Sequence, residues 1–507
     1  MTATILSATP LGYNCSTVNV EGDIKNSLPG MQIIGMGTRS VEEAKERVRS
    51  ALTNSGFTFP PKKIVINLSP AEIPKNGTQI DLAIAVNVLT LSGQLSPKTT
   101  EKKLFLGELA LDGAIKPVRN VIGLCEPKNL PDVNEIFIPH ANAEQTTLLN
   151  DNRIIPVKTL KELILHLLKV APISAVTITP DRTNHLETTP DTSPTLDDIQ
   201  GQEMAKRGAI ISAAGHHNIL LSGPPGVGKT LIAKTLANLL PPLSQEEAKS
   251  VVRIYSMISG LQNIDILKRP FRDPHHTASY SSITGGGHGL RPGEISLAHT
   301  GVLFLDELPE YSRNVLESLR QPLEDKKITL NRAGGSTTYP SDFILVATMN
   351  PCPCGYYEDD TKICTCTASQ IQKYKKKLSG PLLDRIDISI KLSRPQNAYA
   401  SVEKSLSKDQ HEQSVEQIIY AKHRQYERFK CSNLYNATVT NFSPKTTFKI
   451  TTDALNIAEI AAKNLQLSPR VYQKILRISR TIADLDRSDT VKDYHLTEAL
   501  QFSGRFQ

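Results

Sequence analysis

The chain has no tryptophan, and aromatic residues account for only 5% of its 507 positions. Stacking of nucleobases on aromatic side chains is therefore not expected to dominate any contact with nucleic acid. The sequence has no run of about 18 apolar residues, the length that a membrane-spanning helix needs. The opening segment, MTATILSATPLGY, also lacks the basic stretch of a signal peptide. We expect a cytoplasmic protein with no membrane partner.

Cysteine is scarce outside one cluster. Cys15, Cys125 and Cys431 are isolated, which gives no basis for a disulfide framework and favours a reducing compartment. The other four cysteines form two CxC pairs separated by nine residues: Cys352, Cys354, Cys364 and Cys366. Four thiolates on a loop that folds back suit tetrahedral Zn²⁺ in a closed structural site. Because CxC is tighter than the usual CxxC spacing, a metal-free thiol loop or a redox disulfide pair remains an alternative.

The remaining composition is that of a multidomain globular protein. With 39% hydrophobic and 21% charged residues, the chain can bury sizeable cores. Its length is too great for a single core, so two to four domains are expected. The net charge of +7 is mildly basic, which is compatible with a polyanionic partner but is weak evidence for one.

Changes in pattern divide the chain into four segments. Residues 1–170 combine a helical pattern, EEAKERVRSALTNSG, with apolar runs of strand length, KKIVINLSP, KLFLGELAL and NEIFIPHA, and predict an α/β domain. Residues 171–195 are rich in threonine and proline and predict a linker. Residues 196–394 predict a second α/β domain. Residues 395–507 repeat apolar positions at intervals of three and four, which predicts mostly helix.

A glycine-rich motif, GPPGVGKT, lies between the apolar run NILLS and the helical pattern LIAKTLANLL. This strand–loop–helix context is that of a P-loop, in which backbone N–H groups and a helix N-terminus hold phosphate oxygens. Lys229 can reach the β- and γ-phosphates, and the Thr230 hydroxyl can bind Mg²⁺. A glycine turn with a surface lysine is the alternative, and the flanking pattern disfavours it. The predicted ATP-binding positions are Gly223, Pro224, Pro225, Gly226, Val227, Gly228, Lys229, Thr230 and Leu231.

An acidic pair ends the next buried strand pattern, GVLFLDE. Asp306 would hold the metal and its water shell, and Glu307 would orient or deprotonate the attacking water. Asn350 ends a further strand pattern, FILVATMN, and could position the same water through its amide. The alternatives are a solvated acidic turn for the pair and a turn-forming asparagine before Pro351.

Two arginines are candidates for stabilising the charge of phosphoryl transfer. Arg385 lies in SGPLLDRIDISI, where Asp384 and Asp387 could instead pair with it. Arg470 lies in LSPRVYQKIL, near the start of a predicted helix. A guanidinium supplied by a neighbouring subunit makes hydrolysis depend on assembly. From the residues alone, a structural salt bridge is an equal alternative for each.

Residues 196–507 resemble the Mg-chelatase-like branch of the AAA+ ATPases. The resemblance is carried by GPPGVGKT, PFRDPHHTAS, GGGHGLRPGEISLAHTGVLFLDELPE, VLESLRQPLE, ATMNPCPCG and SGPLLDRID. Together with residues 1–170, the chain is similar to the ComM/YifB family of bacterial proteins. This implies a P-loop AAA+ three-layer core with a C-terminal helical lid, and a ring, expected to be a hexamer, with ATP between subunits.

The resemblance also implies residue roles. Arg385 would be the arginine finger that acts on the neighbouring subunit, Arg470 the sensor in the lid, and Asn350 the sensor after the acidic strand. Ile199 and Gln200 would lie near the adenine. One departure concerns Asp273 in FRDPHH, where relatives usually carry serine. Asp273 lies beside the residues that are expected to face DNA, so this departure bears on their contacts.

Residues 1–170 resemble the Lon-type peptidase domain, an S5-like α+β fold. PKNGTQIDLAIA is similar to the segment of the serine nucleophile, and LGELALDGAIKPVRNVIGL to the segment of the catalytic lysine. This chain has Gln79 at the serine position and Ile122 at the lysine position. Neither residue can serve in a Ser–Lys dyad. We therefore expect a catalytically inactive module with a structural or interaction role.

Two segments are expected to face the pore of the ring, as the resemblance implies: FRDPHHTASYSSITGGGHGLRPG and the hairpin DKKITLNRAGGSTTYP. Their basic residues would contact the DNA backbone without regard to sequence. The candidates are Arg272, His275, His276, Arg291, Lys326, Lys327 and Arg332. Ordinary solvated loops are the alternative. The run Lys375–Lys377 predicts a solvated helix face and not a binding site.

The favoured hypothesis is an ATP-driven DNA translocase or helicase. The resemblance implies branch migration on single-stranded or branched DNA during natural transformation, with recombination proteins as possible partners. The alternative is a motor without DNA, like the ATPase subunit of Mg-chelatase, which the Lon-like domain and the cysteine loop disfavour. A module that only senses ATP is a third possibility, disfavoured by Asp306 and Glu307. Bound zinc would fix the cysteine loop so that the following helix delivers Arg385 to the neighbouring ATP.

Overall fold

The computed structural model describes residues 2–35, 39–75, 77–176, 193–258, 268–287, 290–332, 335–359, 361–394 and 409–503. Most of the predicted linker, residues 177–192, lies outside the described residues. Residues 333–334, which include the first glycine of the Gly-Gly tip of the predicted hairpin, and residues 395–408 also lie outside them. No helix in the described ranges combines the length and the apolar character that crossing a membrane demands.

The N-terminal region is built on a mixed sheet of seven strands. Across the sheet these are β3 (Gly30–Ile34), β4 (Lys63–Ser69), β2 (Asn14–Lys25), β1 (Thr2–Leu11), β5 (Lys103–Phe105), β8 (Glu135–Pro139) and β9 (Ile154–Val157). The runs KKIVINLSP, KLFLGELAL and NEIFIPHA contribute β4, β5 and β8, as predicted. The long antiparallel pair of β1 and β2 was not predicted, because its polar and apolar residues alternate only in part.

Two helices cover one face of this sheet. They are α2 (Ala44–Asn54), which the helical pattern predicts, and α3 (Asp81–Leu91), and α6 (Leu160–Leu167) packs into the same core beside them. Every residue of α3 is buried, which explains why DLAIAVNVLTL has no polar face. The other face packs against α4 (Val121–Leu124) and a second, smaller core.

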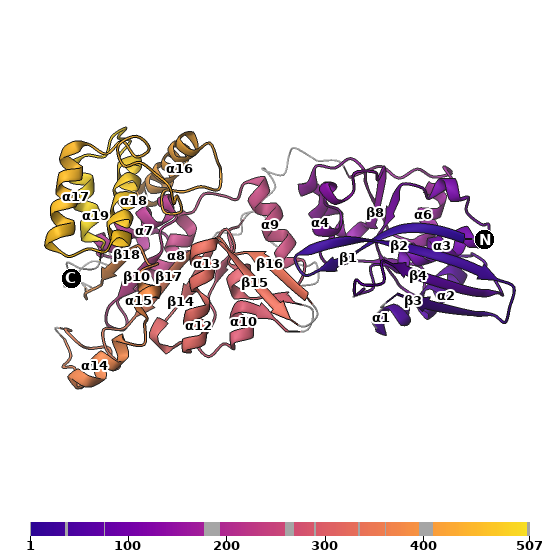
Figure 1. Ribbon diagram of the computed structural model, residues 1–507, viewed down its shortest axis with the longest axis horizontal. Helices are drawn as coiled ribbons and strands as arrows, with labels where there is room; N and C mark the ends of the chain where they lie inside the picture. The colour runs from indigo at the N-terminus through magenta and orange to yellow at the C-terminus, as the bar shows by residue number, and fades with distance from the viewer. Residues whose placement is uncertain are drawn as a thin grey trace.

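The second α/β domain is a parallel sheet of five strands between two layers of helices (Figure 1). The strand order is β11 (Phe271–Arg272), β14 (Val302–Leu305), β17 (Ile344–Met349), β10 (Ile219–Ser222) and β18 (Ile388–Lys391). All four residues of β14 are buried, as expected of a parallel strand covered on both faces.

Alternate residues of β10 enter different cores. Ile219 and Leu221 pack with α7 (Glu203–Gly215) and α8 (Lys229–Leu239) on one face. Leu220 packs on the other face, with α12 (Arg313–Ser318) and α13 (Arg320–Asp325). The hairpin of β15 (Lys327–Arg332) and β16 (Gly335–Pro340) follows α13. The sheet therefore lies in the middle of three layers.

The C-terminal helices form a separate layer at the end of the molecule opposite the N-terminal sheet (Figure 1). They are α16 (Asp409–Phe429), α17 (Thr452–Asn464), α18 (Pro469–Leu485) and α19 (Asp493–Gln501). Ser468 caps α18 by accepting a hydrogen bond from the Val471 N–H, and Pro469 occupies the first turn. This cap fixes where α18 begins and therefore where Arg470 lies.

Candidate functional site

The P-loop connects the end of β10 to the start of α8. Gly226 and Gly228 have φ values of +81° and +90°, and a Cβ at either position would meet no neighbouring atom within 4 Å. Glycine is therefore required there by the backbone conformation and not by crowding. The open space in front of the loop and the N-terminus of α8 can receive phosphate groups. Of the predicted adenine contacts, Ile199 is buried in the same core as Val227, whereas Gln200 is exposed.

Lys229 crosses from the P-loop to the end of β17. Its Nζ donates to the Gly223 carbonyl at 2.6 Å and to Oδ1 of Asn350 at 2.8 Å. Burial lowers the pKa of Lys229, and the carboxylates of Asp306 and Glu307 oppose that shift. The structure thus brings together the lysine, the acidic pair and the asparagine that three separate motifs predicted.

Thr348 organises the acidic pair. Its hydroxyl donates to Asp306 and accepts the Glu307 N–H at 3.0 Å. Glu307 has φ +54°, a left-handed conformation that is strained for a residue with a Cβ. The sequence analysis missed Thr348; the signal was its position two residues before Asn350, at the end of the neighbouring strand.

Asp273 lies closer to the acidic pair than the sequence indicated. Its pKa is raised by burial and then by the Asp306 carboxylate, while Lys234 and His275 oppose the shift. β11, which ends one residue earlier, runs parallel to β14 and so directs Asp273 toward the same edge as Asp306. An aspartate at position 273, where the family pattern has serine, therefore affects the side of the site where Asp306 is expected to hold Mg²⁺. It also affects the neighbouring loop of predicted DNA-binding residues.

Arg385 and Arg470 share one carboxylate, that of Glu324. A guanidinium nitrogen of Arg385 donates to Glu324, and Nη2 of Arg470 lies 4.0 Å from the same carboxylate. Both arginines line a cavity of about 260 Å³. Among the described residues that line it, none belongs to the P-loop or to the acidic pair. Nε of Arg385 is buried without a hydrogen-bond partner in the described part of the chain.

Three residues that the sequence analysis missed hold the Arg385 segment in place. The Asn218 side chain donates to the Arg385 carbonyl at 2.9 Å and accepts the Leu345 N–H at 2.9 Å. Lys474, on α18, donates to the Ile386 carbonyl at 2.7 Å. Asn218 precedes β10 and Leu345 belongs to β17, so Arg385 is fixed to the two strands that lead to the nucleotide site. Glu324 carried no signal, because it is one acidic residue among many.

The four clustered cysteines converge. Their sulfurs all lie within 4.8 Å of one another, and the Cys352 Sγ is 3.3 Å from that of Cys354 and 3.6 Å from that of Cys364. Sulfurs around one Zn²⁺ at about 2.3 Å would be about 3.8 Å apart, so the arrangement fits a shared metal ion. Backbone N–H groups of Tyr356 and Thr365 lower the pKa of Cys354 to about 5. Desolvation and the neighbouring thiols instead raise the pKa of Cys364 and Cys366.

The cysteine loop also touches the P-loop. A Cβ at Gly355 would lie 2.9 Å from Cδ of Pro225, so the two loops are in close contact. Farther along, Glu358 pairs with Lys391 of β18, and Asp359 with Arg394 at 3.2 Å. The loop is therefore attached at Gly355, Glu358 and Asp359 to the elements that surround the nucleotide site.

Sequence models of known families match three parts of the chain. Residues 195–400 match "Magnesium chelatase, subunit ChlI", residues 20–142 "Subunit ChlI of Mg-chelatase", and residues 408–503 "Magnesium chelatase, subunit ChlI C-terminal". YifB of Salmonella typhimurium is 39% identical over 97% of this chain and 95% of its own length. Competence protein ComM of Haemophilus influenzae is 38% identical over 99% of this chain and 97% of its own length. The chain belongs to the ComM/YifB family. The 67 kDa magnesium-chelatase subunit of Heliobacterium mobile is a more distant relative, 28% identical over 30% of this chain and 27% of its own length.

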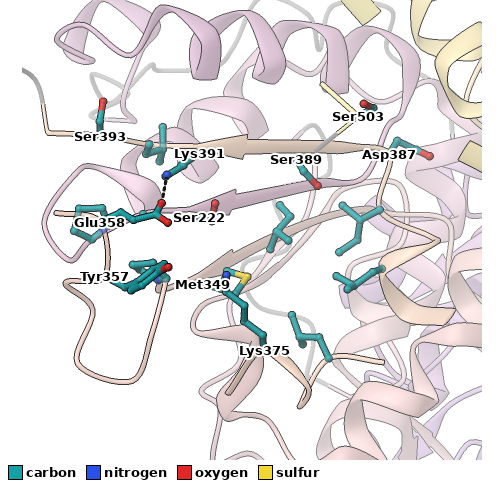
Figure 2. A pocket seen from close by; sticks show the side chains of 18 of the residues that line it. Ser222, Met349, Tyr357, Glu358, Lys375, Asp387, Ser389, Lys391, Ser393 and Ser503 are labelled. Carbon is teal, nitrogen blue, oxygen red and sulfur yellow. Dashed lines mark hydrogen bonds and ion pairs between the residues drawn. The ribbon is translucent and has the colours of Figure 1, made fainter. Parts of the chain in front are cut away.

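Membership in this Mg-chelatase-like AAA+ family implies ATPase activity with ATP and Mg²⁺, and the geometry of the P-loop fits both. A second cavity, larger than that of Arg385 and Arg470, lies beside the P-loop and has a volume of about 660 Å³ (Figure 2). β10, β17 and β18 form its floor, with Ser222, Met349 and Ser389 directed into it. The cysteine loop and α18 form its walls.

The seven residues predicted to bind DNA differ in their surroundings. Two are already paired: Arg272 forms a bidentate ion pair with Glu294, and Lys326 lies 3.3 Å from Asp342. Lys326 lines the cavity of Arg385 and lies outside the hairpin strands. The paired charges of these two residues are less available to a phosphate backbone than the sequence indicated.

The other predicted DNA-binding residues are mostly more exposed than Arg272 and Lys326. His275 and Arg291 are exposed, and the His275 and His276 rings lie 4.1 Å apart. Lys327 is exposed at the base of the hairpin. Arg332 pairs with Gly335 next to the hairpin tip, and its side chain lies outside what the structure describes.

Proposed function

We propose that this chain is the subunit of an ATP-driven ring of six copies that moves along DNA. Its role would be branch migration in homologous recombination during natural transformation. The observation that carries the proposal is the separation of two half-sites. Lys229, Asp306 and Glu307 form one, and Arg385 and Arg470 form the other, in a cavity that these three residues do not line. A neighbouring copy is needed to bring the halves together, as in a ring. The competence protein among the relatives supports the biological setting.

Each residue of the nucleotide half-site has a role that its position supports. Lys229 would hold the terminal phosphates, and Thr230 and Asp306 would hold Mg²⁺ with its water. Glu307 would take the proton of the attacking water, which Asn350 orients. Arg385 and Arg470 of the neighbour would stabilise the charge that develops on the transferred phosphoryl group. Hydrolysis of ATP held by these residues would supply the energy that moves the pore loops.

We assign Zn²⁺ to the cysteine cluster as a structural ion, because four sulfurs that all lie within 4.8 Å of one another suit it. The close approach of Gly355, in the cysteine loop, to Pro225 supports a role for this ion in stabilising the P-loop and the segment that leads to Arg385. We further propose that the N-terminal domain keeps a Lon-like fold without peptidase activity. Gln79 donates to the Thr9 hydroxyl at 3.3 Å, and Ile122 is fully buried, so neither offers the chemistry of a dyad.

A second candidate is a remodelling motor of the Mg-chelatase type that acts on a protein partner without DNA. The descriptions of all three matching family models favour it. The chain resembles the chelatase 67 kDa subunit over only 30% of its length, whereas ComM covers 99% of it, and this difference favours the DNA motor.

The test is the ATPase rate of the purified full chain without DNA, with single-stranded DNA and with a branched DNA junction. The DNA motor predicts an increase of about tenfold on the preferred DNA, reduced at higher salt because phosphate contacts release counterions. Equal rates in all three conditions would favour the remodelling motor instead. Displacement of a labelled strand from the junction, dependent on ATP, would then distinguish branch migration from simple binding.

A further inference from the structure

The turn between β1 and β2 reaches out of the N-terminal domain and rests on the hairpin of β15 and β16. The Tyr13 N–H donates to Oγ1 of Thr337 at 2.9 Å, although the two residues are 324 positions apart. Thr337 lies in the middle of β16, opposite Leu330 of β15. The hairpin predicted to grip DNA is therefore in contact with the N-terminal domain.

Gly12 makes this contact close. Its φ of +60° favours glycine, and a Cβ there would lie 2.3 Å from Oγ1 and 2.5 Å from Cβ of Thr337. Such distances are far below van der Waals contact, so any other residue would push the turn and the strand apart. The absence of a side chain at Gly12 allows the turn to lie directly on β16.

The Tyr13 ring contacts one cationic side chain and one aromatic side chain. The Arg253 guanidinium is 4.2 Å from its centroid on one side, and the Tyr339 ring meets it edge-on at 5.6 Å. Arg253 also donates to the Tyr13 carbonyl at 2.8 Å. Tyr339 belongs to β16 and is fully buried. One residue of the N-terminal domain thus holds both the hairpin and α9 (Gln245–Tyr255), which carries Arg253.

The N-terminal domain supports α9 from a second position. Glu126 pairs with Arg253 at 2.6 Å and with Lys249 at 3.2 Å. Val252 is buried in the core that α4 forms. α9 is therefore fixed to the N-terminal domain, and Arg253 is held in contact with the ring and the carbonyl of Tyr13.

Tyr339 extends the connection to the other predicted pore loop. Its hydroxyl donates to the Leu290 carbonyl at 2.6 Å. Leu290 directly precedes Arg291, one of the exposed candidates for DNA contact. Both predicted pore loops therefore meet at Tyr339, and Tyr13 contacts Tyr339 from the N-terminal side.

We propose that the N-terminal domain sets the position of the two pore loops, with Tyr13 and Gly12 as the positioning residues. The domain would thereby control how the motor grips DNA, without taking part in nucleotide binding. This inference rests on the proposed DNA-motor function for its consequence. The seating of the hairpin itself does not depend on that function.

The seating is tested by hydrogen–deuterium exchange with a matched pair of variants. Gly12→Ala suffers both backbone strain and the collision with Thr337. Gly56→Ala, at φ +86° with nothing within 4 Å, suffers the strain alone. We expect amides of residues 327–332 and 335–340 to exchange at least about tenfold faster in Gly12→Ala, and as in the wild type in Gly56→Ala. Unchanged exchange in Gly12→Ala would refute the seating, whether or not the protein responds to DNA.

The functional consequence is tested with Tyr13→Ala and Tyr13→Phe. Tyr13→Ala removes the ring that contacts Arg253 and Tyr339, whereas Tyr13→Phe keeps it. We expect Tyr13→Ala to lose most of the DNA-stimulated ATPase rate and to keep the rate without DNA, and Tyr13→Phe to behave as the wild type. Full stimulation in Tyr13→Ala would overturn the positioning role and leave the DNA motor intact. A wild type that ignores DNA would instead refute the proposed function, while the exchange experiment still decides the seating.

Discussion

Glu307 is held in an unusual conformation at the position where chemistry is expected. Its left-handed backbone, with φ +54°, is fixed by the N–H bond to Thr348, whose hydroxyl also reaches Asp306. Strain of this kind costs on the order of 1 kcal/mol and persists only where the surroundings hold it. Burial lowers the pKa of Lys229 in the P-loop, and the charges of Asp306 and Glu307 oppose that shift, so the acidic pair acts electrostatically on the P-loop lysine.

We predict that Glu307→Gln binds ATP with nearly normal affinity and hydrolyses it about 100-fold more slowly or worse, because an amide cannot accept the proton of water. A fluorescent ATP analogue measures binding, and a single-turnover assay measures the chemical step.

The matched control for this variant is Glu310→Gln. Glu310 is three residues away, is exposed, and pairs with Lys377 at 3.0 Å. An exposed ion pair of this kind contributes little to the stability of the fold. The rate of ATP turnover by Glu310→Gln should therefore stay within about twofold of the wild-type rate. Normal hydrolysis by Glu307→Gln would assign the base to another residue.

At the scale of elements, the cysteine loop joins the P-loop to the segment that carries Arg385. Gly355 contacts Pro225, and the loop is followed by α14 (Ala368–Lys375) and α15 (Gly380–Leu383), which lead directly to Arg385. A loop of this length without regular structure is costly to order. A metal ion bound by four thiolates would supply the missing constraint.

We predict that the purified protein contains about one Zn²⁺ per chain and that Cys364→Ser loses it. The variant should unfold at a midpoint at least about 5 °C lower and lose most of its ATPase activity, because the P-loop contact and the Arg385 segment are released. Elemental analysis and thermal unfolding provide the measurements. Cys431→Ser, at an isolated and exposed cysteine, should change neither. A metal-free wild type that is folded and active would remove zinc from the description.

The elements that the sequence predicted well are those with a local physical signature. The P-loop, the buried strand before Asp306 and the helix after Lys229 each follow from glycine positions or apolar periodicity. The partners of individual charges could not be predicted in this way. Arg272 pairs with Glu294, and Glu324 joins Arg385 to Arg470, through contacts between segments far apart in the sequence. Those contacts depend on how the elements pack.

At the scale of the whole molecule, the two half-sites of one chain would face different neighbours in the proposed ring. Arg385 and Arg470 meet at Glu324, beside the buried Lys474 of the lid helix α18. The P-loop and acidic pair lie at the carboxyl ends of β10 and β14, whereas Asn218 fixes Arg385 from the start of β10. β10 thus separates the P-loop, at its carboxyl end, from the Arg385 segment, which in the proposed ring would act on the nucleotide of the next subunit.

This arrangement predicts complementation between two inactive variants. Arg385→Ala retains Glu307, and Glu307→Gln retains Arg385. In mixed rings, some interfaces combine the P-loop side of an Arg385→Ala subunit with the arginine side of a Glu307→Gln subunit. Such an interface contains both Glu307 and Arg385. Random mixing in equal amounts makes about a quarter of the interfaces complete, so up to about a quarter of the wild-type ATPase rate should return. If Arg385 acted on the nucleotide of its own chain, no interface would be complete, and the mixture would be as inactive as either variant alone.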